Sequence, residues 1–117
     1  MDNTLQLVKD ITSDICITIL LNTHRTKPDK LQDRIVLKNL IQQASSRLLT
    51  FETKEKAEFL TNKLRKIEDS INHLENQESL LIFVNENIAT YTRLPISVGN
   101  RVVIDTTFAT RDLIRAL

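Results

Sequence analysis

The sequence predicts an α+β domain in which a mixed sheet of about four strands carries two long helices. Short apolar, β-branched runs recur along the chain and are typical of strands. Between the first two runs, apolar side chains instead recur at helical spacing. The predicted order of elements is therefore α-β-α-α-β-β-β-α, and 117 residues with 41% hydrophobic side chains are enough for one buried core.

The N-terminal elements are defined by where the apolar runs begin and end. Residues 3–11 place their apolar side chains on one helical face, and residues 12–14 are expected to end this short helix. Residues 15–21 form a strand that is apolar on both faces, which is typical of a central strand. Its Cys16 is the one cysteine, which indicates a buried, unreactive thiol and a reducing compartment.

Two long helices follow this strand. We expect the first over residues 30–49 with Asp29 as its N-cap, and the second over residues 54–74 with Thr53 as its N-cap. An apolar stripe with 3-4-3-4-3 spacing runs along the second helix, formed by Ala57, Leu60, Leu64, Ile67, Ile71 and Leu74. The stripe indicates either packing on the sheet or a coiled-coil or homodimer interface. The interface residues would be Leu60, Leu64, Ile67 and Ile71.

The C-terminal part contains short elements. They are predicted as strands at residues 79–84, 88–94 and 101–105 and a helix that starts near Arg111. Residues 85–87 form the turn of a hairpin, and Thr110 is the expected helix cap. The last helix is still apolar at Leu117, so we expect residues 1–117 to be one domain of a longer multidomain protein.

The composition argues against several classes of function. A single glycine leaves no room for a glycine-rich phosphate loop, and no serine or cysteine lies in a nucleophile motif. His24, His73 and one cysteine do not form a metal-ligand pattern. We therefore expect no catalytic residue, cofactor or metal in this chain. The chain has neither a signal peptide nor an apolar run of membrane-spanning length, which indicates a cytoplasmic protein without a membrane partner.

A local basic surface is predicted where the first strand ends, although the net charge is only +1. The loop after the strand carries cations, and the next helix carries three more at i, i+4 and i+8, an arrangement that suits a phosphate backbone. The predicted RNA-binding residues are Asn22, Thr23, His24, Arg25, Lys27, Lys30, Arg34 and Lys38. In the opposing interpretation, Asp29 and Asp33 neutralise these cations and Lys30 pairs with Asp33.

Three stretches of the chain resemble one protein family. They are ITILLNTHRT, DRIVLKNLIQQASSRLL and RLPISVGNRVVIDTTFATRDLIRAL. With them the chain resembles the N-terminal domain of the archaeo-eukaryotic class-1 peptide-chain release factor superfamily, and more closely its bacterial branch. In that family a phenylalanine and a helix close this domain, as Phe108 and Leu113 would here. The resemblance implies that the surface over residues 22–38 docks on the ribosome or another structured RNA.

The resemblance also limits the activity that can be expected. The family's peptide-release chemistry belongs to a middle domain with a Gly-Gly-Gln tripeptide, and this chain contains no Gly-Gly pair. Where eukaryotic members read stop codons with Asn-Ile-Lys-Ser, this chain has residues 30–33, Lys-Leu-Gln-Asp. The resemblance therefore implies a non-enzymatic docking domain in termination-related translation, ribosome rescue or hibernation, with no DNA partner. The competing hypotheses are a protein-interaction module that uses the 57–74 stripe and a hydrolase that acts through His24.

Overall fold

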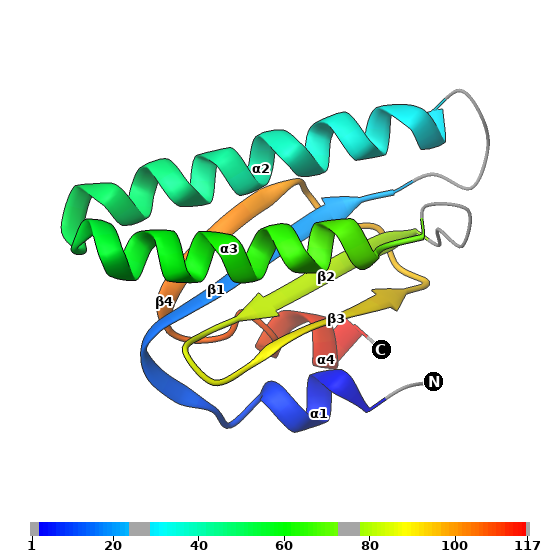
Figure 1. Cartoon of the computed structure of the whole chain (residues 1–117). Coiled ribbons are helices and arrows are strands. Elements are labelled where there is room, and N and C mark those ends of the chain that lie inside the picture. The colour runs from blue at the N-terminus through cyan, green and yellow to red at the C-terminus, as the bar shows by residue number, and fades with distance from the viewer. Residues whose placement is uncertain (1–2, 24–28, 73–77, 117) are drawn as a thin grey trace.

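The computed structural model describes residues 3–23, 29–72 and 78–116, with side chains except at residues 29–31, 112 and 116. The elements in this part of the chain are α1 (Thr4–Val8), β1 (Thr12–Asn22), α2 (Asp29–Phe51), α3 (Lys54–Ser70), β2 (Ser79–Val84), β3 (Ala89–Leu94), β4 (Arg101–Thr107) and α4 (Arg111–Ala116). This order confirms the predicted α+β fold. Figure 1 shows three layers, with α2 and α3 on one face of the sheet and α1 and α4 on the other.

The sheet has the strand order β3-β2-β1-β4 within the described residues, and each pairing there is antiparallel. The predicted mixed character of the sheet is therefore wrong. The reason is the number of helices between the first two strands. Because α2 and α3 run in opposite directions, they return the chain to the end at which β1 stops, and β2 must run back along β1 (Figure 1).

Strand β1 is central and longer than predicted. It pairs with β2 from Ile17↔Val84 to Asn22↔Ser79, and it pairs with β4 on its other side. Residues 12–14 belong to the strand instead of ending a helix, since Thr12 pairs with Thr107 before the register shifts ahead of Cys16. Threonine is β-branched and favours extended backbone, which explains why this polar stretch continues the strand.

Helix α3 packs its apolar stripe on the sheet. Leu60 and Leu64 are fully buried, and they belong to a core that includes side chains of α2, β1 and β2. The four residues considered for a dimer interface are all buried in this core: Leu60, Leu64, Ile67 and Ile71. A second chain could reach them only if α3 left the sheet, so the stripe is not an exposed interface. The helix ends at Ser70, four residues before the predicted end, because Ile71 is extended with ψ 127°. The predicted end at Leu74 lies outside the described residues.

A second core lies on the opposite face of the sheet, under α1 and α4. Phe83 of β2 and Phe108 meet edge to face, with ring centroids 5.4 Å apart. Cys16 and Leu113 are buried in the same cluster. Burial raises the pKa of the Cys16 thiol above its ordinary value, which agrees with the expected unreactive thiol.

Local hydrogen bonds explain where two connections form. Thr53 caps α3 as predicted, because its Oγ1 accepts a hydrogen bond from the Lys56 N–H at 3.2 Å. The Asn85 Oδ1 accepts hydrogen bonds from the N–H groups of Asn87 at 2.8 Å and Ile88 at 2.7 Å, which closes the predicted turn between β2 and β3. None of the described helices has the length and apolar character needed to cross a membrane.

Candidate nucleic-acid interface

The predicted RNA-binding residues begin where β1 ends, at the same end of the molecule at which α2 begins (Figure 1). The Asn22 N–H donates to the Asn100 side-chain oxygen at 2.6 Å, and the Thr23 N–H donates to the Glu78 carbonyl at 3.0 Å. Thr23 is only 3% exposed, so its side chain offers little surface to RNA, and its part in RNA binding stays a prediction. Asn22 is half-buried, and both backbone bonds fix the exit of the chain from the sheet.

Four of the predicted cationic or histidine side chains cannot be placed. His24, Arg25 and Lys27 lie outside the described residues. Lys30 lies in the first turn of α2, and its side chain is also outside the described part of the chain. Their contribution to the basic surface stays a prediction from sequence.

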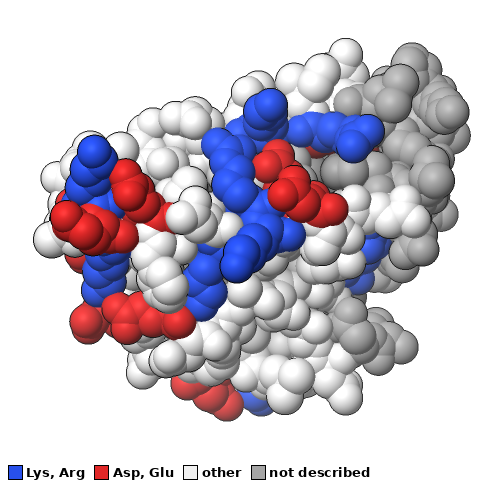
Figure 2. All heavy atoms as spheres, viewed as in Figure 1, with Lys and Arg blue, Asp and Glu red and all other residues white. Residues whose placement is uncertain are grey.

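Arg34 and Lys38 lie one helical turn apart on α2, and both are exposed. They line a hollow between α2 and α3 with a volume of about 390 Å³, which we call the helix-pair hollow. Its other lining residues are Ile35, Glu68, Asp69 and Ile71. In Figure 2, Lys and Arg side chains gather over this helical layer with Asp and Glu side chains between them. The spacing on α2 thus predicted a real surface cluster.

The helix-pair hollow also carries two carboxylates that are not among the predicted site residues. Glu68 and Asp69 enter it from α3, and with Arg34 and Lys38 they balance its charge. Arg65 continues the mixed pattern, since it donates to Glu68 and to Gln42, each at 3.3 Å. Glu68 lies one helical turn after the buried Leu64, so the sequence places it beside the buried face of α3, but its contact with the α2 side depends on the tertiary fold.

The opposing interpretation places Asp33 among the carboxylates that neutralise this surface. Asp33 is 2% exposed, so its side chain is buried at the start of α2. The side chains of Asp29 and Lys30 are not described, and their pairing stays untested. The second helix contributes carboxylates as well, since Glu68 and Asp69 line the helix-pair hollow.

Two lysines of α3 hold the turn between β2 and β3. Lys63 Nζ donates to the carbonyl oxygens of Asn85 at 2.6 Å and Glu86 at 2.9 Å, and its desolvation lowers the pKa of the ammonium group. Lys56 pairs with the Glu86 carboxylate at 3.1 Å, and this hydrogen bond raises the pKa of Lys56. Glu52 also favours the charged form of Lys56. Both lysines are therefore engaged within the protein.

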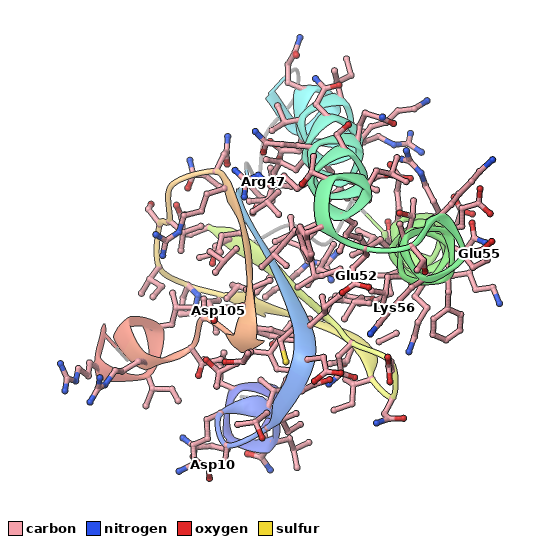
Figure 3. All side chains as sticks on the ribbon, turned by 90° about the vertical axis from the view of Figure 1, so that its left-hand side faces the viewer. Asp10, Arg47, Glu52, Glu55, Lys56 and Asp105 are labelled. Atoms are coloured by element: carbon pink, nitrogen blue, oxygen red, sulfur yellow. The ribbon has the colours of Figure 1, made fainter. Side chains whose placement is uncertain are left out.

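Figure 3 views the end of the molecule at which α2 meets α3, where Arg47 lies beside the edge strand β4. Arg47 Nη1 donates to the Val102 carbonyl at 2.8 Å, and the Asp105 carboxylate accepts from the Thr106 N–H at 2.7 Å. The Arg47 contact occupies a backbone carbonyl of the edge strand β4, and Asp105 places a negative charge on the same strand. Both features disfavour pairing of this edge with another strand.

Comparison with known proteins does not identify the chain: no protein-family model matches it, and no curated protein matches it significantly. The residues that the structure describes also contain no group of three His, Cys, Asp or Glu side chains placed to hold a metal ion. The site can therefore be interpreted only from its own geometry and charge.

Proposed function

We propose that this domain docks on ribosomal or another structured RNA through the surface formed by the start of α2. The observation that carries the proposal is the pair Arg34 and Lys38. Both side chains are exposed one turn apart, and neither forms an ion pair or hydrogen bond with another described residue. Cations that are not engaged within the protein can contact RNA phosphates.

The carboxylates of the helix-pair hollow give this surface a second chemical property. Glu68 and Asp69 repel phosphate but can accept hydrogen bonds from base amino groups and ribose hydroxyls. A mixed surface of this kind favours RNA with a shape that places phosphates on α2 and hydrogen-bond donors on α3. It disfavours indiscriminate binding along a phosphate backbone.

The resemblance to release-factor N-terminal domains supports the same surface and suggests the process. We propose a cytoplasmic role in translation, such as termination-related function, ribosome rescue or hibernation. In this proposal the domain is a docking platform without catalysis, and any peptidyl-tRNA hydrolysis would belong to another domain. Fold-level analogy alone does not establish a process, so the docking step is the part to be tested first.

The test is co-sedimentation of the 117-residue chain with ribosomes at about 0.1 M salt, where exposed charges act over about 10 Å. Arg34→Glu with Lys38→Glu should reduce binding at least about tenfold, because both phosphate contacts become repulsive. Lys54→Glu with Lys66→Glu is the matched control, since it changes net charge equally and its lysines are exposed outside the helix-pair hollow. Equal binding by both double variants would remove this surface as the docking site.

The alternative function, a protein-interaction or homodimerisation module, needs a different surface because the α3 stripe is buried. The observation that favours it is at the end of α2, where Leu49 is 54% and Phe51 is 55% exposed. Sedimentation velocity distinguishes the two functions. A dimer that becomes a monomer in Leu49→Lys with Phe51→Lys would support a homodimer, and a monomeric wild-type chain would argue against one.

A further inference from the structure

A second hollow lies under the opposite face of the sheet, between the end of α1 and α4. Its volume is about 390 Å³, and we call it the terminal hollow. Its lining residues are Lys9, Thr107, Phe108, Thr110, Arg111, Ile114 and Arg115. They come from both ends of the sequence, so no local motif could have indicated them.

The described side chains that line the terminal hollow include three cations, whereas the side chain of Asp112 on α4 lies outside the described part of the chain. Lys9, Arg111 and Arg115 are exposed, and no carboxylate occurs among the described side chains that line the hollow. Asp10 and Asp105 are close in sequence to lining residues but do not line it. Among the described residues, the three cations form no ion pair. Three like charges around one concavity raise the local concentration of anions.

The cations stand beside apolar surface. Arg111 and Arg115 lie four residues apart on α4, hence on one side of the helix, and the half-buried Ile114 contributes apolar surface to the same hollow. Phe108 is buried with its ring against Phe83, so it supports the hollow from beneath and does not offer a free ring for stacking. An arginine guanidinium can stack on a planar base while another binds phosphate.

We propose that the terminal hollow binds a nucleotide unit, with Lys9 and one of the two arginines on its phosphate and with its base against Ile114 and the guanidinium plane of the other arginine. The volume lies within the range of about 300–1,000 Å³ that ligand pockets show. A free nucleotide and one unit of a single-stranded RNA share this chemistry. The existence of this site does not depend on the RNA docking proposed for α2. Assignment of the nucleotide to an RNA strand rests on that proposed function.

The first experiment is an NMR titration of the ¹⁵N-labelled chain with uridine monophosphate and with a ten-nucleotide oligouridylate. Both should shift amide signals of residues 107–115. Binding of the oligonucleotide at least about tenfold tighter would identify an RNA strand as the source, since further phosphates add counterion release. Equal affinities would identify the free nucleotide. Shifts confined to residues around Arg34 and Lys38, or no shifts with either ligand, would overturn the proposed site.

The second experiment uses matched variants. Arg111→Gln with Arg115→Gln should weaken uridine monophosphate binding at least about tenfold, because a charge-assisted hydrogen bond to the phosphate and the guanidinium that stacks on the base are both lost. Lys54→Gln with Lys66→Gln removes the same charge at exposed positions outside both hollows and should leave nucleotide affinity unchanged. If the α4 variant does not fold, Lys9→Gln, just after α1, provides the same test. Unchanged nucleotide affinity in both a folded α4 variant and Lys9→Gln would overturn the proposal.

The two proposals fail separately in these experiments. A chain that binds uridine monophosphate through residues 107–115 but does not sediment with ribosomes would disprove the docking function and leave the nucleotide site. A chain that sediments through Arg34 and Lys38 but shows no nucleotide binding at α4 would disprove the nucleotide site alone.

Discussion

The helix-pair hollow and the terminal hollow have the same volume but different electrostatic character, since the charges of the first are mixed and the described charges of the second are all positive. The first combines Arg34 and Lys38 with two carboxylates from α3. The second gathers three cations with no described carboxylate in its lining. A chain with a net charge of +1 can therefore still present a concentrated positive site, because the fold and not the composition distributes the charges.

The walls of the two hollows are also anchored differently. Helix α3 is 17 residues long and buries a full apolar stripe, whereas α4 has six residues and is held mainly through Leu113. Short terminal helices with few buried contacts open at a lower free energy than core helices. The helix-pair hollow should consequently be a permanent feature, and the terminal hollow should depend on the docking of α4.

The largest effect is expected from loss of core packing under the helix-pair hollow. Leu64→Ala should lower the free energy of unfolding by about 2–5 kcal/mol, because it leaves a cavity at a fully buried position. Urea denaturation measures this change. Lys66→Ala, at an exposed position on the same helix, should change it by less than about 0.5 kcal/mol. A Leu64→Ala chain of normal stability but altered oligomeric state would restore the interface interpretation of the stripe.

A smaller loss of stability is expected on the other side of the sheet. Leu113→Ala should cost about 2 kcal/mol, at the low end of leucine truncations, because a short terminal helix can relax into the space. Cys16 lies in the same core cluster and serves as a probe of its opening. Alkylation of Cys16 should be faster in Leu113→Ala than in wild type and slower when uridine monophosphate is bound. Equal alkylation rates in all three samples would show that α4 does not control this core.

The charge difference between the two hollows can be reduced by removing the carboxylates of the helix-pair hollow. Glu68→Gln with Asp69→Asn converts the helix-pair hollow into a cationic surface and should tighten binding to an RNA duplex by about three- to tenfold at low salt. Fluorescence anisotropy with a labelled duplex measures the change. Glu55→Gln with Glu58→Gln, on exposed positions of α3 outside the hollow, is the control. Equal gains in both variants would indicate a general charge effect and no specific role for the hollow.

The smallest effect concerns pH and the core under α4. Burial holds the pKa of Cys16 above its ordinary value of 9.0, so the unfolded chain loses the thiol proton first. The stability that this group contributes is present below pH 9.0 and is lost as the pH rises through the folded-state pKa. The pKa of Lys63 lies below its ordinary value of 10.5, so its effect on stability has the opposite sign. Its contribution to the free energy of unfolding increases as the pH rises toward 10.5.

The measurement is urea denaturation of wild type and Cys16→Ala between pH 8 and 10, a range that brackets the ordinary thiol pKa of 9.0. The difference between the two proteins isolates the thiol, because Lys63 is present in both. Wild type should lose more stability than Cys16→Ala as the pH rises. Parallel pH profiles would mean that the thiol ionises equally in the folded and unfolded chains.

The sequence predicted local features well and relations between distant elements poorly. Apolar spacing was sufficient to find α2, α3 and the β2–β3 hairpin, and the Thr53 cap followed from its side chain alone. The antiparallel sheet depended on how two helices return the chain, which no local pattern contains. Helical spacing on α2 likewise found Arg34 and Lys38 but not the carboxylates that α3 brings beside them. Lys9 and Arg111 line the same hollow because α1 and α4 cover the same face of the sheet.

The pairing of β1 with β4 has a consequence for how the protein is made. β1 is complete at Asn22, yet its second neighbour begins only at Arg101. At roughly 5–20 residues per second, a ribosome needs about 4–16 s to synthesise the residues between them. During this time one edge of an apolar central strand has no native partner. The nascent chain is therefore exposed to aggregation until its last strand emerges, and early contact with a chaperone should increase its yield.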